Sequence, residues 1–358
     1  MRYLFKVNYT QDIRLFQHQG QVIWYGVLAA ALLVAPWLLP EYFVSQFGFI
    51  FIYSIVGLGL MLLSGYTGLL SIGHAAFLGI GAYTEAILQA RGWPFPLSVM
   101  AAMLLAAIAG VVIGLPALRI RGIYLAIATL AFGFIVEEII TRWESVTAGN
   151  SGKAVAVIVL AGLKIDSEIK FYYVALAIVA AVTLGMLNLL RSPTGRAFVA
   201  IRDSEISAQS MGINLAYYKT LSFALSAACA GIAGALYAHK LRFITPDQFT
   251  FLQSIELLMM IVIGGVGSIH GAFFGAAFFI ALPQLIVLLK DFLPASIGQA
   301  SGLQPTLFGL VMIGFVLFEP MGIYGRWLKI RTYFQLFPFY RRAMFKRQKM
   351  YLKAERLR

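Results

Sequence analysis

Residues 47–74 of the chain read FGFIFIYSIVGLGLMLLSGYTGLLSIGH. The first part, residues 47–63, is apolar throughout and carries no charged side chain. A bilayer's hydrocarbon core of about 30 Å is crossed by about 20 such residues in a helix. The stretch therefore predicts a membrane-spanning helix that is followed, at residues 64–74, by a break rich in glycine and hydroxyl groups.

The rest of the chain has the same apolar character. Hydrophobic residues make up 60% and charged residues 12%, whereas soluble domains carry about 25% charged residues. A soluble globular protein is therefore excluded. The apolar runs are continuous and do not alternate, so a β-barrel is also excluded and the backbone must be satisfied within helices. The fold class is an all-α polytopic membrane protein with about ten transmembrane helices, expected near residues 22–40, 47–63, 71–90, 97–118, 122–141, 171–190, 221–239, 254–268, 271–289 and 303–320.

These runs divide the chain into a short N-terminal segment (1–21), a transmembrane domain (22–320) and a C-terminal tail (321–358). Two connections within the transmembrane domain are long, namely residues 142–170 and residues 191–219. They lie on opposite sides of the membrane if every run crosses it.

The net charge of +13 is concentrated at one end of the chain. The segment from Gly325 to Arg358 holds eleven Lys or Arg residues against one acid, Glu355. Basic residues collect on the cytoplasmic side of membrane proteins, so both termini and the loop at 191–219 are expected in the cytoplasm. A basic tail next to a membrane suits the anionic lipid of the bilayer. No basic folded face remains for nucleic acid.

The inner loop contains one amphipathic segment. Residues 191–196 are interpreted as a turn, because proline and glycine punctuate them. Residues 197–211 then have helical spacing, with an apolar stripe on one side and Arg202 and Asp203 on the other. Gly212 is a natural C-terminal stop. A helix presented in this way either docks a soluble partner or lies on the bilayer surface, and the spacing leaves both open.

The break at residues 64–74 is the second candidate site. Interrupted helices expose backbone amides and helix N-termini, which can bind a carboxylate or another polar group within the membrane. The alternative is a plain turn between two spans. The candidates for a translocation path are Ser64, Gly65, Thr67, Gly68, Ser71, Gly73 and His74.

Glu256 lies inside the predicted span 254–268. A charge at the centre of a span costs about 2.5–3.5 kcal/mol on insertion scales, so such residues are functional candidates by default. Glu256 is therefore added to the candidate path, as a proton or ion pathway or as a structural hydrogen bond. Glu85 raises the same question in the span at 71–90.

Several chemical signatures are missing from the sequence. It contains no G-x-x-x-x-G-K-[ST] phosphate-binding loop and no H-E-x-x-H zinc motif. The single cysteine, Cys229, excludes an internal disulfide framework. The sequence thus predicts no catalytic residue, no metal site and no cofactor in this chain.

Four stretches, in this order, resemble the branched-chain amino-acid ABC transporter permease family of the LivM type. They are GYTGLLSIGHAAFLGIGAY (65–83), RIRGIYLAIATL (119–130), SPTGRAFVAIRDSEISAQSMGI (192–213) and SIELLMMIVIGGVGS (254–268). Together they extend the resemblance over roughly residues 50–320. The transmembrane domain is accordingly expected to be the permease domain of such an importer.

The resemblance implies an importer in the bacterial cytoplasmic (inner) membrane that is assembled from separate parts. The partners would be a second permease subunit of the LivH type, two ABC ATPase subunits that bind ATP and Mg, and a periplasmic solute-binding protein. The inner loop then resembles the coupling helix that sits in a cleft of the ATPase. The residues expected to make this contact are Arg202, Asp203, Glu205, Ala208 and Gly212.

The resemblance is less specific about the solute. Family members often have Thr-Gly-Gly where this chain has Thr147-Ala148-Gly149, so related permeases for urea, short amides or aromatic and other carboxylates stay open as alternatives. His74 fits the amino-acid branch better than the urea branch. An ion-coupled secondary transporter, with Glu85 or Glu256 as the coupling group, is the alternative from a different class.

Overall fold

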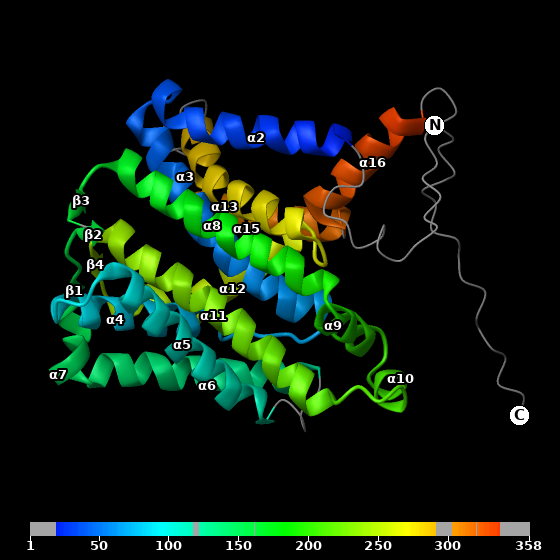
Figure 1. Cartoon of the computed structure of the whole chain (residues 1–358), viewed down its shortest axis with the longest axis horizontal. Coiled ribbons are helices and arrows are strands. Elements are labelled where there is room, and N and C mark those ends of the chain that lie inside the picture. The colour runs from blue at the N-terminus through cyan, green and yellow to red at the C-terminus, as the bar shows by residue number, and fades with distance from the viewer. Residues whose placement is uncertain (1–18, 117–121, 161, 291–302, 320, 337–358) are drawn as a thin grey trace, which may run out of the picture.

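The computed structural model describes residues 19–116, 122–160, 162–290, 303–319 and 321–336 (Figure 1). Its long helices are α2 (Gln19–Leu38), α3 (Glu41–Leu60), α4 (His74–Ala90), α5 (Phe95–Gly114), α6 (Ile123–Arg142), α8 (Glu168–Arg191), α11 (Leu215–Leu241), α12 (Phe251–Gly264), α13 (Ile269–Lys290), α15 (Leu303–Phe318) and α16 (Gly322–Leu336). Most of the N-terminal segment and of the basic tail, residues 1–18 and 337–358, lie outside the described residues.

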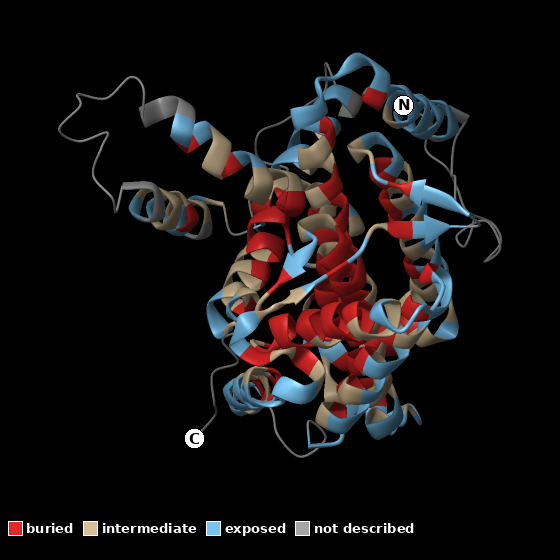
Figure 2. Ribbon diagram, turned by 90° about the vertical axis from the view of Figure 1, so that its left-hand side faces the viewer, coloured by how far each residue is buried: buried red, intermediate tan, exposed pale blue. Residues whose placement is uncertain are grey.

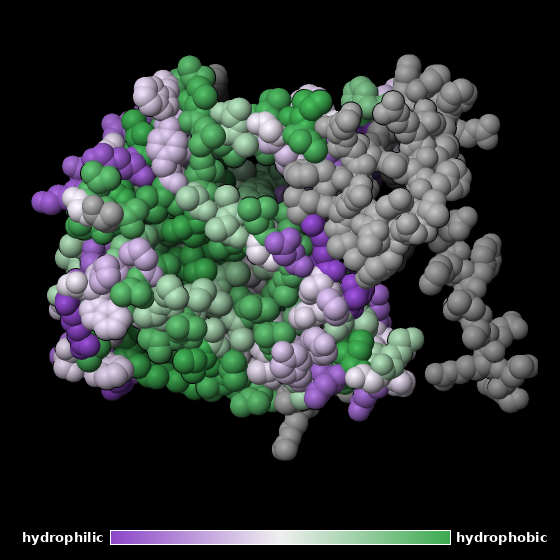
Figure 3. All heavy atoms as spheres, viewed as in Figure 1, coloured by the Kyte–Doolittle hydropathy of each residue, from purple (hydrophilic) through white to green (hydrophobic). Residues whose placement is uncertain are grey.

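The helices have the lengths and the hydropathy of membrane spans. Eight helices in the described part of the chain are long and apolar enough to cross a bilayer. Two of the ten predicted spans, 71–90 and 303–320, correspond to shorter helices, α4 with 17 residues and α15 with 16. The all-α polytopic fold is confirmed, whereas the count of about ten is not. Figure 3 shows an apolar belt between two polar ends, as expected of a protein that lies across a bilayer.

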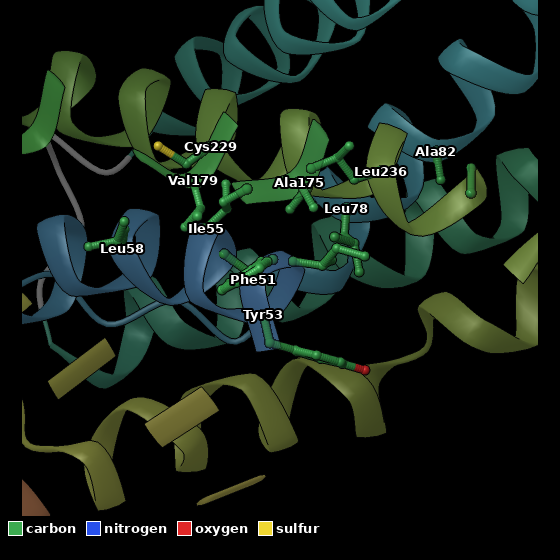
Figure 4. Packing of buried hydrophobic residues seen from close by; sticks show 14 of the residues in the cluster. Phe51, Tyr53, Ile55, Leu58, Leu78, Ala82, Ala175, Val179, Cys229 and Leu236 are labelled. Carbon is green, nitrogen blue, oxygen red and sulfur yellow. The ribbon is translucent and has the colours of Figure 1, made fainter. Parts of the chain in front are cut away.

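Helix α3 lies at the centre of the bundle, because it is apolar on every side. It packs against α8, α11 and α13, and its residues from Phe51 to Leu60 are all buried. Figure 4 shows Phe51 and Ile55 of α3 in one cluster with Val179 of α8 and Leu236 of α11. The buried residues gather around these central helices, whereas the outer helices expose one face (Figure 2).

Two small sheets cover one end of the bundle, which we call the strand end (Figure 1). Strand β1 (Lys153–Ala154) pairs antiparallel with β4 (Phe243–Ile244), and β2 (Ile158–Leu160) pairs antiparallel with β3 (Leu163–Ile165). The short elements α7 (Glu144–Thr147), η3 (Gly149–Ser151) and η4 (Pro246–Phe249) lie beside them in the chain. The apolar residues 158–160 therefore belong to a short strand pair at this end.

The opposite end carries α9 (Pro193–Asp203) and α10 (Glu205–Ser210), and we call it the docking end (Figure 1). The predicted turn at 191–196 and single helix at 197–211 are wrong in detail. Ser192 caps α9, accepting from the Gly195 amide at 3.4 Å, and Pro193 takes the first helical position. Ser204 has extended backbone (φ −163°) and caps α10 through the Ser207 amide, so it separates the two helices.

Helix α11 joins the two ends without interruption. It begins at Leu215, directly after the Asn214 side chain that caps it, and it ends at Leu241, two residues before β4. Its 27 residues correspond to about 40 Å at 1.5 Å per residue. Along this length it packs against α5, α4 and α3.

Candidate functional site

The predicted break is present in the structure. Helix α3 continues into a π-helical turn, η1 (Met61–Tyr66), and α4 begins only at His74. Residues 67–73 between them are not helical. Wide turns of this kind are rare and are frequently found at functional sites.

The polar groups of the break are largely bonded within the protein. The amide and hydroxyl of Thr67 both donate to the carbonyl of Leu62, at 3.1 and 3.0 Å. Ser64 donates to the carbonyl of Leu69. The amide of Ile72 donates to the Thr129 hydroxyl of α6 at 3.0 Å. The break is thus held to the helices around it.

The first turn of α4 is bonded in the same way. The Ala75 amide donates to the Ser254 hydroxyl of α12 at 3.0 Å. His74 is fully buried, and its Nε2 lies 2.8 Å from the Ser226 hydroxyl of α11. Because that hydroxyl donates to the Gly59 carbonyl at 2.6 Å, it accepts the proton of His74 Nε2. The His74 Nδ1 then accepts from Ser71 at 3.3 Å. His74 therefore holds α4, α3 and α11 together.

Three glycines of the break occupy positions that suit other residues poorly. At two of them a side chain would have no room, and at the third the backbone conformation is unfavourable for a residue with a Cβ. A Cβ on Gly73 would lie 2.1 Å from the Thr129 carbonyl, and one on Gly65 would lie 2.7 Å from the Gly267 amide. Gly68 has φ +77° and is exposed, a conformation that glycine adopts most readily. Gly65 and Gly73 therefore lie where the backbone of the break closely approaches a neighbouring segment.

Glu256 is the member of the candidate path that the structure does not place at the break. It lies half-buried on α12, two residues after Ser254, and residues two apart point to different faces of a helix.

Glu85 has a structural role that the sequence did not reveal. Its Oε1 accepts from the Ser98 hydroxyl at 2.7 Å and lies 2.8 Å from His239 Nε2. The other ring nitrogen of His239 faces the carbonyl of Ala156 at 3.2 Å. Both ring nitrogens of His239 therefore lie within hydrogen-bond distance of an oxygen atom. The pair ties α4 and α11 to the strand end.

At the docking end, the predicted contact residues divide into two groups. Ala208 is buried, and Glu205 forms an ion pair of 2.6 Å with Lys219 of α11, whose side chain is 2% exposed. These two hold α10 against α11. Arg202, Asp203 and Gly212 are exposed.

Gly212 ends α10 as predicted. It has φ +83°, and the amides of Gly212 and Ile213 return to the carbonyls of Gln209 and Ala208 at 3.0 and 3.1 Å. This pattern is a Schellman motif, which glycine favours. The prediction of a C-terminal stop at this position is confirmed.

Two exposed apolar residues at the docking end were missed by the sequence analysis. Ile206 of α10 is 73% exposed, and Met211, directly after this helix, is 82% exposed. A groove of about 440 Å³ lies between α10 and the start of α11, and it is lined by Glu205, Gln209, residues 212–216 and Lys219. The available signal was that Ile206 falls outside the buried stripe of Ile201 and Ala208. The two residues are candidates for a contact with another protein, which is tested below.

The Glu205–Lys219 pair gives a first expected result. Glu205→Arg places a second cation against the buried Lys219, so α10 should detach and transport should fall at least tenfold, while membrane insertion is unchanged. The exchange variant Glu205→Lys/Lys219→Glu restores opposite charges and should recover most of the activity, measured as solute uptake into vesicles. An exchange variant as inactive as Glu205→Arg would contradict a positioning role for the pair.

Among the described residues, no group of three or more His, Cys, Asp or Glu side chains could hold a metal ion. The candidate residues are those of the break at 67–73 and of the end that carries α9 and α10, and the buried Glu85–His239 and Glu205–Lys219 contacts lie outside the break.

Comparison with known proteins places this arrangement in a family. Residues 42–318 match the family described as branched-chain amino acid transport system / permease component. The chain is 35% identical over 297 residues to the high-affinity branched-chain amino acid transport system permease protein LivM of Escherichia coli (strain K12). The matched region covers 76% of this chain and 67% of that protein.

More distant relatives have related names. Over 233 residues the chain is 26% identical to the probable branched-chain amino acid transport permease protein LivM of Methanocaldococcus jannaschii, covering 62% of this chain and 67% of that protein. It is 26% identical over 251 residues to the autoinducer 2 import system permease protein LsrC of Enterobacter sp. (strain 638), with 68% of each covered. No solved structure matches the chain. The chain belongs to the family of permease components of branched-chain amino acid transport systems.

Proposed function

We propose that this chain is the membrane-spanning permease subunit of an ATP-driven importer for branched-chain or related amino acids. The family match supports the transport role, and the exposed Ile206 of α10 and Met211 directly after it support docking of a separate ATPase. ATP and Mg would be bound by that ATPase and not by this chain. The coupling segment comprises α9 and α10, with Arg202, Asp203, Glu205, Ala208 and Gly212.

The complete importer would contain a second permease subunit of the LivH type, two ABC ATPase subunits and a periplasmic solute-binding protein. In the inner membrane, the docking end and both termini would face the cytoplasm, and the strand end would face the binding protein. The strands and short helices at that end offer a surface outside the apolar belt (Figures 1 and 3).

In this mechanism the chain carries out no chemistry. ATP-driven closure of the partner moves α9 and α10, and the movement reaches the breaks at residues 67–73 and 265–268, where helices end and restart. Breaks of this kind allow helices to move as separate bodies around a path. The translocation path would then be lined from the break, with Ser64, Gly65, Thr67, Gly68, Ser71, Gly73 and His74 shaping it.

The relatives named above favour an importer permease over an ion-coupled secondary transporter, and they do not favour urea, short amides or aromatic carboxylates as the solute. The LsrC relatives indicate that the family extends to other solutes. The solute is therefore tested directly, by uptake of labelled leucine, isoleucine and valine into vesicles that contain the complete importer.

The docking surface gives the test of this function. Ile206→Glu/Met211→Glu places two charges in the apolar contact, so ATPase co-purification and ATP-driven uptake should each fall at least tenfold. The matched control is Leu163→Glu, an equally exposed leucine (74%) at the strand end, and it should leave ATPase co-purification unchanged. Uphill uptake by the purified chain alone, without an ATPase, would refute the proposal.

A further inference from the structure

Arg202 does not contact the exposed apolar side of α10. Its side chain reaches from the end of α9 into the membrane domain, where Nη1 donates to the Gly65 carbonyl at 3.1 Å. Gly65 belongs to η1, and 137 residues separate the two in sequence. The contact therefore joins the coupling segment to the break.

The chemistry of this contact favours arginine. Gly65 lies in the last turn of η1, where carbonyl groups have no further amide of the helix to accept from, and a cation there is favoured by the helix dipole. Asp203 accepts from Nε and Nη2 of the same guanidinium at 3.1 and 3.0 Å. Asp203 thus holds the planar guanidinium in one orientation, with Nη1 directed at the Gly65 carbonyl. The compact ammonium group of lysine cannot make both contacts in this geometry.

Two further glycines bring backbone to the same point. A Cβ on Gly68 would lie 3.0 Å from Arg202 Cγ, and one on Gly267 would lie 3.9 Å from Arg202 Nη1. Gly267 belongs to the second break, residues 265–268, and its amide donates to the Met61 sulfur of η1 at 2.9 Å. One arginine therefore lies where α9 and both helix breaks meet.

We propose that Arg202 is a positioning residue that transmits movement of the coupling segment to the two helix breaks. This proposal rests on the proposed function, because it requires an ATPase that moves α9 and α10. It assigns Arg202 to the connection between docking and the transport path, and not to the docking contact itself.

The first test separates transmission from docking. In the complete importer, Arg202→Gln should keep ATPase binding and ATP hydrolysis within about twofold of wild type, while uptake falls at least tenfold, so that solute moved per ATP falls. Arg202→Lys should recover only part of the uptake. A loss of hydrolysis in parallel with uptake would overturn the proposal, because that is the result of a lost docking contact or a misfolded chain.

The matched control is Arg196→Gln, on the same helix. Arg196 Nη1 donates to the carbonyl of Arg191 at the end of α8, whereas Arg202 Nη1 donates to Gly65 of η1, so this variant should keep wild-type solute per ATP. An equal loss in this variant would show that general charge on α9 matters, and would also overturn the specific role of Arg202. If the wild-type importer shows no ATP-dependent uptake, the proposed function fails before Arg202 is tested.

A second test uses a covalent replacement of the contact. A Cβ on Gly68 would lie 3.5 Å from Arg202 Cβ, within the range of about 3.5–4.5 Å between the Cβ atoms of a disulfide. Gly68→Cys/Arg202→Cys should be uncoupled when reduced and should regain solute per ATP when oxidised, with Gly68→Cys alone insensitive to oxidation. The native Cys229 is buried and does not compete.

The outcomes of this second test are distinct. Recovery on oxidation, reversed by a thiol reductant, supports transmission through this contact. An oxidised form that stays as uncoupled as the reduced form, with the cross-link verified by mass spectrometry, would overturn the proposal. A reduced double variant with wild-type coupling would do the same, since the arginine would then be dispensable.

Discussion

Replacing Glu85 by alanine is expected to lower the free energy of unfolding by about 3–5 kcal/mol, the cost of breaking a buried ion pair. The Glu85 and His239 side chains are 0% and 2% exposed, so His239 would keep its polar ring without a carboxylate and without water. The measurement is denaturant unfolding of the purified protein in detergent micelles.

The control for this variant is Glu138→Ala. Glu138 also pairs with a basic residue, Arg142, but their side chains are 57% and 80% exposed, and exposed pairs contribute about 0–1 kcal/mol. The double variant Glu85→Leu/His239→Phe replaces both charges with apolar groups and should be more stable than Glu85→Ala. If the Glu85→Ala protein were as stable as the Glu138→Ala protein, the buried pair would contribute little to the free energy of unfolding.

Replacing Gly73 by alanine is expected to be nearly as damaging, by about 3 kcal/mol, the upper part of the range for overpacking. The new Cβ would lie 2.1 Å from the Thr129 carbonyl and 2.9 Å from its carbon. These are backbone atoms, so α4 and α6 must move apart and lose the bond from the Ile72 amide to Thr129. Uptake should be lost together with stability.

Gly133→Ala is the matched control for Gly73→Ala. Gly133 faces the same contact from α6, but its added Cβ would lie 3.7 Å from the Gly73 Cα, which is ordinary van der Waals contact. This variant should keep wild-type unfolding and uptake. If Gly73→Ala behaved like Gly133→Ala, the close approach of α4 and α6 would not be needed and the break would be an ordinary turn.

The fold class and the break could be predicted because both depend on residues that are close together in the sequence. Apolar runs of 17–25 residues identify spans without knowledge of their neighbours, and the glycines of residues 64–74 interrupt one of them. The start of α9 was also readable, because Ser192-Pro193 is an N-cap followed by proline at the first helical position. A turn was nevertheless predicted there, because proline and glycine are also common in loops.

The contacts that connect the site could not be predicted. Glu85 and His239 are 154 residues apart, and Arg202 and Gly65 are 137 residues apart. A single sequence gives the cost of each buried charge but not the partner that offsets it. The same limit applied to Glu205, whose partner Lys219 falls within the next span and looks on sequence grounds like a residue at the membrane surface.

Helix α11 has a further consequence for how the two ends communicate. It starts beside α10 and ends beside β4, and no proline interrupts it. A tilt at one end of such a helix moves its other end as well, since a helix bends less readily than a loop. A protein that binds the strands and a protein that binds α10 would therefore be coupled through α11. Each should then change the affinity of the other for this chain by the same factor.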